Sequence, residues 1–125
     1  MIEADVKANI VAAMFNAGGY GRRVEDKYLV GTPDLILAHP LVGTVIAEAK
    51  MVLHNVFAPT PRQRVEMQRI DNGGGVAVLV GYKQSVDRYY LHKTPARGDN
   101  VNIIDCVHSA RFVEALIEWR RLNER

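Results

Sequence analysis

The chain has 125 residues, of which 48% are hydrophobic and 24% charged, which suits one compact domain. Sixteen basic and 14 acidic residues leave a formal net charge of +2, which permits a nucleic-acid partner without requiring one. The single cysteine, Cys106, cannot form an internal disulfide and fits a reducing compartment. No apolar run approaches about 18 residues and no signal pattern opens the chain, so we expect no membrane partner.

Residues 2–16 are predicted to form the first helix, which Gly18 and Gly19 end. Apolar side chains recur there at helical spacing, at Ile2, Val6, Ile10 and Met14. Glu3 lies seven residues before Ile10 and therefore on the same face as this stripe. Two interpretations stay open for Glu3. It is either a first-turn carboxylate that the helix dipole favours, or an acid that faces the acidic cluster described below.

Residues 20–30 are predicted to form an extended, polar strand that leads into the next two elements. Arg22 and Arg23 lie in this strand and could hold phosphate groups as bidentate donors. Alternatively, they cover an exposed strand edge, where charge prevents aggregation. Glu25, in the same strand, could be a further acidic ligand or a solvated glutamate.

Two short runs rich in Val, Ile and Leu follow, at residues 31–37 and 44–50. The link between them is short, so they are predicted to pair as an antiparallel hairpin. If the hairpin is centred on Leu41, Asp34 lies directly opposite Glu48. Lys50 follows Glu48 by two residues and shares its face of the strand.

Two opposed carboxylates on one face of a ribbon place like charges about 5 Å apart, which is destabilising. A hard divalent cation would remove that cost, because carboxylate and carbonyl oxygens suit Mg²⁺ or Mn²⁺. This inference depends on the register, since a slip of one residue would move Asp34 to the other face.

Residues 51–59 are predicted to be a loop or a strand extension, and residues 60–70 a second helix. Thr60 suits its N-cap, Pro61 its first position, and Gln63 the place of the Glu or Gln in a capping box. Gln63 could instead bind a phosphate or a metal-bound water at the helix N-terminus. The sequence does not choose between these two interpretations. The first turns of this helix are polar and basic, with Arg62 and Arg64.

Residues 74–82 are the most apolar stretch and are predicted to form a strand buried on both faces. A helix separates this strand from Lys50, which favours a crossover parallel to the strand that ends there. Residues 87–93 are predicted to add a strand nearer the edge, and residues 101–107 a short extended segment. Ser109 is expected to cap a final helix docked on the sheet through Phe112, Leu116 and Trp119.

The order of these motifs resembles the PD-(D/E)xK nuclease superfamily, and within it the VRR-NUC branch and the phage and archaeal Holliday-junction resolvases. The resemblance rests on a helix with an acid, Gly-Thr-Pro-Asp34, Glu48-Ala49-Lys50 and a basic helix with Gln63. It covers residues 3–82, about two-thirds of the chain. The joint occurrence of these motifs is more specific than any one of them alone.

The resemblance implies a single nuclease domain over residues 1–125 with an α/β, restriction-endonuclease-like core. We expect a mixed central sheet of about four to five strands flanked by helices. It implies that Asp34, Glu48 and the carbonyl of Ala49 hold Mg²⁺ or Mn²⁺. Lys50 would orient the attacking water and steady the charge of the transition state, and Gln63 and Glu3 would complete the catalytic set.

The implied function is a metal-dependent DNA endonuclease that selects branched or four-way-junction DNA and acts as a homodimer. Four arginines are expected to contact the DNA: Arg22, Arg23, Arg62 and Arg64. The resemblance also implies action in the cytoplasm of a bacterial or phage-infected cell. One alternative is a non-catalytic nucleic-acid-binding module on the same fold. Another is a structural protein whose hairpin acids are solvated strand ends.

Other catalytic classes lack their signatures in this sequence. It contains no Cys/His cluster with zinc spacing, no G-x-S-x-G, no phosphate-binding loop and no dinucleotide fingerprint. The acidic hairpin is therefore the one catalytic site that the sequence predicts.

Overall fold

The structure, a computed structural model, describes residues 1–24, 31–98 and 100–124. Its helices are α1 (Glu3–Asn16), α2 (Pro61–Asn72) and α3 (Phe112–Leu122), with 3₁₀ turns η1 (Gln84–Val86) and η2 (Ile103–Asp105). Its strands are β1 (Tyr20–Arg23), β2 (Leu35–His39), β3 (Gly43–Met51), β4 (Val56–Phe57), β5 (Ala77–Lys83), β6 (Arg88–Lys93), β7 (Val101–Asn102) and β8 (Val107–Ser109). The predicted ligand candidate Glu25 lies outside the described residues.

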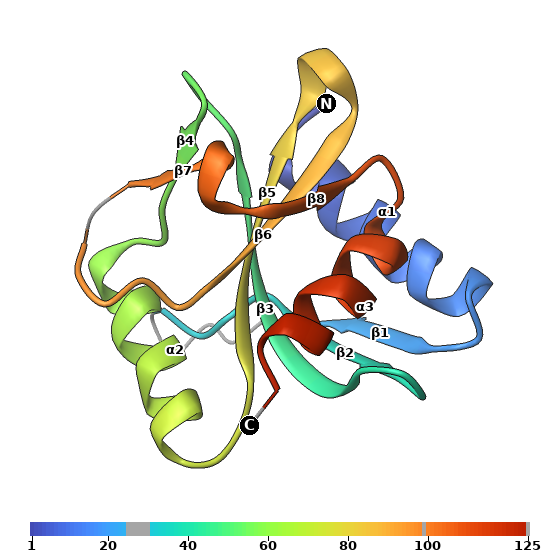
Figure 1. The fold of residues 1–125 in the computed structure, drawn as a ribbon, viewed down its shortest axis with the longest axis horizontal. Helices are drawn as coiled ribbons and strands as arrows, with labels where there is room; N and C mark the ends of the chain where they lie inside the picture. Colours follow the sequence, from blue (N-terminus) through green and yellow to red (C-terminus); the bar gives the residue numbers. More distant parts are fainter. Residues whose placement is uncertain (25–30, 99, 125) are drawn as a thin grey trace.

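A mixed sheet in the order β1-β2-β3-β5-β6-β8 forms the centre of the molecule (Figure 1). β3 and β5 are parallel, as predicted from the helix between them, and the other neighbours are antiparallel. The sheet has six strands where four to five were expected, because β8 adds a strand beyond β6. A second, two-stranded sheet pairs β4 with β7.

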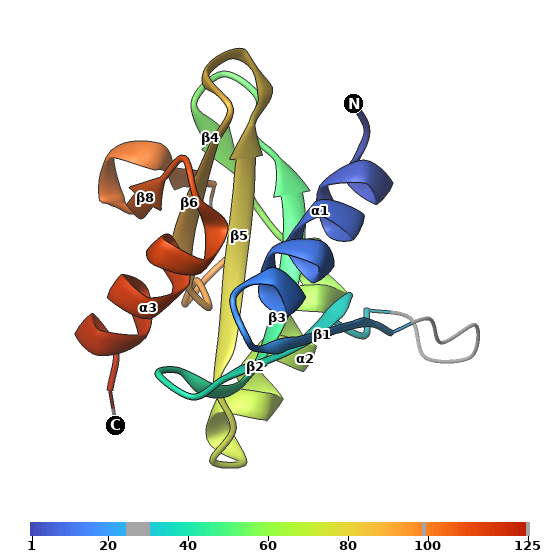
Figure 2. The same cartoon turned by 90° about the vertical axis from the view of Figure 1, so that its right-hand side faces the viewer.

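The helices cover the two faces of the sheet unequally. α1 and α3 lie together on one face, and α2 lies on the other (Figure 2). Phe57 of β4 and Val101 of β7 join Met67 of α2 in the cluster on the second face. The fold therefore has three layers, with the central strands buried on both sides.

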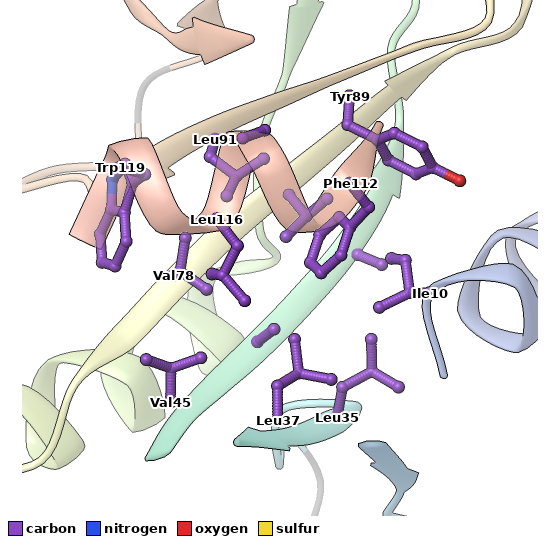
Figure 3. Packing of buried hydrophobic residues seen from close by; sticks show 14 of the residues in the cluster. Ile10, Leu35, Leu37, Val45, Val78, Tyr89, Leu91, Phe112, Leu116 and Trp119 are labelled. Atoms are coloured by element: carbon purple, nitrogen blue, oxygen red, sulfur yellow. The ribbon is translucent and has the colours of Figure 1, made fainter. Parts of the chain in front are cut away.

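Alternation along the strands divides the core into two parts. Val45, Ala47 and Ala49 of β3 belong to the larger cluster, beneath α1 and α3. Phe112, Leu116 and Trp119 of α3 pack on this face, which confirms the predicted docking of the terminal helix (Figure 3). Burial of each such side chain contributes about 1.5–3 kcal/mol. The intervening residues of β3, Glu48 and Lys50, are left to face α2.

Several predicted boundaries were wrong. Ser109 does not cap the final helix, which begins three residues later at Phe112 after the N-cap Arg111. The Ser109 hydroxyl accepts a hydrogen bond from the Arg111 amide at 3.1 Å and donates one to Glu114 at 3.2 Å. The predicted extended segment 101–107 is interrupted by η2. Of the predicted strand 20–30, residues 20–23 form β1, and residues 25–30 lie outside the described part of the chain.

Candidate active site

The register of the β2–β3 hairpin places Asp34 next to Glu48. Leu35 pairs with Ala47 and Ile36 with Ile46, so the next position along the ladder aligns Asp34 with Glu48. The backbone amide of Asp34 donates a hydrogen bond to Oε2 of Glu48 at 3.2 Å. The predicted register is therefore confirmed, and Glu48 faces α2, from which Gln63 contacts it.

Glu48 is the one buried polar or charged residue among those that the structure describes, with 1% of its surface exposed. Its Oε1 atom accepts a hydrogen bond from Gln63 Nε2 at 2.7 Å and lies 3.6 Å from Lys50 Nζ. Burial, followed by a hydrogen bond and charge repulsion from Asp34, raises the pKa of Glu48 to about 9 from its ordinary 4.5, and Lys50 and Lys7 oppose this rise. A carboxyl group with so few neutralising partners favours either a proton or a cation.

Gln63 caps the start of α2, as one of its two sequence interpretations predicts, and it also contacts Glu48. Its backbone amide donates to Thr60 Oγ1 at 3.2 Å, and its Oε1 accepts from the Thr60 amide at 2.8 Å, which completes a capping box. Its Nε2 reaches Glu48 at the same time. One side chain can do both because its amide has an acceptor at one end and donors at the other. Binding of a phosphate or a metal-bound water by Gln63 stays a prediction.

A glycine brings the segment before Asp34 against the start of α2. Gly31 has a φ of +90°, and a Cβ atom placed there would lie 2.9 Å from the backbone of Arg62. Side chains rarely tolerate either condition, so Gly31 permits this close approach. The contact helps to hold Asp34 beside the residues that α2 contributes.

Asp34 contacts a residue that the sequence did not single out. Lys7 of α1 places its Nζ atom 3.0 Å from Asp34 Oδ2. Oδ2 is buried, yet it accepts no well-aligned hydrogen bond from the described residues, so the Lys7 contact is ionic rather than a directed hydrogen bond. Lys7 follows Glu3 by one helical turn, so the two residues share a face of α1. That spacing is visible in the sequence, but it does not show which element the face packs against.

Ala49 follows Glu48 in β3. The Ile46 amide donates to the Val76 carbonyl and the Val52 amide to the Tyr82 carbonyl, so the alternate residues 47 and 49 direct their backbone groups toward β2. The β2–β3 ladder ends at the pair Leu35–Ala47. The same spacing would put Pro33, which has no N–H to donate, opposite Ala49. The role of the Ala49 carbonyl as a metal ligand stays a prediction.

The remaining predicted residues lie farther from this centre or have other partners. Glu3 is half-buried in the first turn of α1. Within the described ranges, no three His, Cys, Asp or Glu side chains are close enough to hold a metal ion, so Glu3 does not form a three-acid cluster with Asp34 and Glu48. Its catalytic role stays a prediction.

The four arginines differ in their surroundings. Arg22 and Arg23 are exposed on β1, the edge strand, and Arg62 is exposed in the first turn of α2. Arg64 is half-buried, and its Nη1 donates to Gln68 at 3.2 Å and to the Ala96 carbonyl at 3.5 Å. Arg64 therefore ties α2 to the loop after β6.

The comparisons with known proteins bear on the fold. No family model matches the sequence, and no curated protein matches it. The fold is similar to that of a Holliday junction resolvase. That protein is Hjc of Archaeoglobus fulgidus, an archaeal hyperthermophile, and the superposition has a TM-score of 0.63 at 10% sequence identity. It covers 79% of this chain and 87% of the resolvase.

This similarity confirms the predicted α/β, restriction-endonuclease-like core, the fold on which PD-(D/E)xK nucleases are built. At such low identity the match concerns the fold alone, and the VRR-NUC branch stays a prediction. Among the described residues, no helix combines the length and apolar character needed to cross a bilayer.

The donor set fits a hard divalent ion. It offers the carboxylates of Asp34 and Glu48, and one of the Asp34 oxygens, Oδ2, is buried without an aligned hydrogen bond. The Ala49 carbonyl stays a predicted third ligand. Mg²⁺ and Mn²⁺ prefer such oxygen ligands, and Mg²⁺ usually retains several waters beside one or two carboxylates. Two protein carboxylates are thus enough for such a site.

A hollow of the surface lies away from these residues. A cavity of about 500 Å³ is lined by residues of α1 and of the start of α3, among them Ala13, Phe112 and Ile117. It opens on the face opposite Glu48 and includes none of the predicted site residues. The candidate site is instead a charged cluster at the junction of β2, β3 and α2.

Proposed function

We propose that this protein is a Mg²⁺- or Mn²⁺-dependent endodeoxyribonuclease that hydrolyses phosphodiester bonds in branched DNA. One observation carries the proposal: Asp34, Glu48 and Lys50 converge at one point of the sheet, with Glu48 almost fully buried and held by Gln63. A binding module has no use for buried acids where phosphate must approach, so the arrangement favours catalysis over the non-catalytic alternative.

Each residue has a role that follows from its place. Asp34, Glu48 and the Ala49 carbonyl would hold the ion, which when bound polarises the scissile phosphate and offsets its charge. Lys50 Nζ lies 3.6 Å from Glu48 Oε1, where it can orient the attacking water and stabilise the negative charge that develops on phosphorus oxygens. Gln63 fixes the carboxyl of Glu48 by its hydrogen bond and so keeps the ligand geometry.

Branched DNA is the proposed substrate class. The fold is similar to that of a Holliday junction resolvase, and the chain is small, without an evident module that reads base edges. The exposed Arg22, Arg23 and Arg62 would contact backbone phosphates. Symmetric cutting of a junction requires two sites, so we propose that the active form is a homodimer. The proposed place of action is the cytoplasm of a bacterial or phage-infected cell.

The test is a cleavage assay on labelled four-way-junction, flap, duplex and single-stranded DNA with Mg²⁺, Mn²⁺ or EDTA. We expect metal-dependent cutting of branched DNA that EDTA abolishes and that the Asp34→Asn variant lacks. Tight binding of DNA without cutting under any metal would instead identify a non-catalytic binding module. A folded protein that neither binds nor cuts DNA would leave the structural alternative.

Asp105→Asn is the matched control for the Asp34 variant. Asp105 is an exposed aspartate at the end of η2, outside the candidate site, so this change should leave cutting intact. If Asp34→Asn cut DNA as well as Asp105→Asn does, the assigned site would be wrong, and the cutting would come from another site or from a contaminating nuclease.

A further inference from the structure

Lys7 is the feature of the site that neither the sequence motifs nor the proposed mechanism uses. Its Nζ atom lies 3.0 Å from Asp34 Oδ2, and the two side chains are only 17% and 19% exposed. The ion pair joins α1 to the start of β2, two elements far from α2 and Gln63 in the sequence. Lys7 reaches Asp34 from α1, which lies on the face of the sheet opposite α2 (Figure 2).

The ammonium group lies against one of the two Asp34 oxygens that a divalent ion could use. Metal–oxygen bonds of Mg²⁺ and Mn²⁺ are about 2.1 Å long, so an ion bound to Oδ2 would lie no more than about 5 Å from Lys7 Nζ. A dication and an ammonium at that separation repel each other strongly in a half-buried site. Lys7 and the ion therefore cannot both keep their most favourable position on Asp34.

We propose that Lys7 is an internal counter-ion that holds Asp34 in the metal-free protein and competes with the divalent ion for it. This inference rests on the proposed function, because it concerns the metal of that site. Lys7 stabilises the acid pair before metal binds, and its side chain must turn away from Asp34 when metal enters. Metal affinity is thereby lower than the two carboxylates alone would give. Lys7 is a positioning residue in this scheme, since it acts through Asp34.

The test is titration of the whole protein with Mn²⁺ alone, without DNA, by calorimetry, together with denaturant unfolding in EDTA. Lys7→Met keeps the length and the helix propensity of the side chain but removes its charge. We expect it to bind Mn²⁺ roughly tenfold more tightly, while the metal-free protein becomes less stable because Asp34 loses its partner. A merely structural role for Lys7 would lower stability without raising the affinity for Mn²⁺.

Two further variants keep the result interpretable. Lys93→Met, at an exposed position at the end of β6, changes the net charge equally and should leave Mn²⁺ affinity as in the wild type. Lys7→Arg retains the charge and should also keep wild-type affinity, which tests the idea even if Lys7→Met does not fold. Affinity in Lys7→Met that equals or falls below that of Lys93→Met overturns the proposal, as does absence of Mn²⁺ binding in both.

The two proposals can fail separately. Tighter Mn²⁺ binding by Lys7→Met in a protein that cuts no DNA would support the competition and reject the nuclease. Metal-dependent cutting with unchanged Mn²⁺ affinity in Lys7→Met would reject the competition and retain the nuclease.

Discussion

Gln63 Nε2 donates a hydrogen bond to Glu48 Oε1 at 2.7 Å, while the other end of the same amide accepts from the Thr60 backbone. One side chain thus completes the N-terminal capping box of α2 and orients the buried acid of β3, Glu48. The position of the helix and the orientation of the carboxyl group are therefore coupled. This coupling allows the structural and chemical roles of Gln63 to be separated by mutation.

Gln63→Ala should lose both contacts. We expect about 0.5–2 kcal/mol less stability, the usual range for a lost cap, and roughly tenfold weaker Mn²⁺ binding because Glu48 loses its orienting donor. Thr60→Ala is the control: it removes the hydroxyl cap but keeps the backbone N–H that anchors Gln63. It should lower stability without weakening Mn²⁺ binding. Equal losses of Mn²⁺ affinity in Gln63→Ala and Thr60→Ala would show that Gln63 has no role at Glu48 apart from capping the helix. Unfolding curves and Mn²⁺ titration provide the two measurements.

The stability of the metal-free protein should fall as pH rises. Burial raises the pKa of Glu48 to about 9 in the folded chain, above the ordinary 4.5 that we assign to the unfolded chain. Between these values the folded state binds more protons than the unfolded state, so the free energy of unfolding decreases with increasing pH, by at most about 1.4 kcal/mol per pH unit. Urea unfolding in EDTA from pH 5 to 9 measures this slope.

Glu48→Gln removes the titrating group and should abolish that part of the slope. Glu118→Gln, on the exposed surface of α3, should retain it. Saturating Mn²⁺ should also flatten the decline in the wild type, because an ion replaces the proton on Glu48. A slope that is the same in all three proteins without metal would show that Glu48 ionises normally.

Lys50→Met should separate catalysis from metal binding. The ammonium lies beside Glu48 but donates no ligand to a cation, so we expect Mn²⁺ affinity to be retained or increased. Single-turnover cleavage of a DNA junction should fall by roughly 10²–10³-fold, the loss typical of one charge-stabilising group. Cleavage at the wild-type rate would remove Lys50 from the proposed mechanism.

Gly81→Ala should destabilise the fold beside the site. Gly81 pairs with Lys50, and a Cβ atom there would lie 2.8 Å from the ring of Phe57. Overpacking of this kind costs about 1–3 kcal/mol, since the ring and β4 must shift. Gly98→Ala provides the control, because a Cβ at Gly98 would meet nothing within 4 Å. Equal thermal stability of the two variants would contradict the packing described here.

Local patterns in the sequence determined much of this architecture. The apolar period of α1, the short link between β2 and β3 and the helix before β5 predicted the elements and the parallel pairing of β3 with β5. The same alternation predicted that Asp34 and Glu48 share a face, because a hairpin transmits its register from residue to residue. These features depend on contacts between residues close in sequence.

Tertiary packing decided the rest of the site. The contact of Lys7 with Asp34 exists because α1 docks across the sheet, and the contact of Gln63 with Glu48 exists because α2 approaches from the other face. Periodicity fixes the face of a helix but not the element opposite it. The burial that raises the pKa of Glu48 likewise arises only when strands and helices enclose it. The sequence by itself thus determined which acids meet, and the folded chain decided which cations and amides hold them.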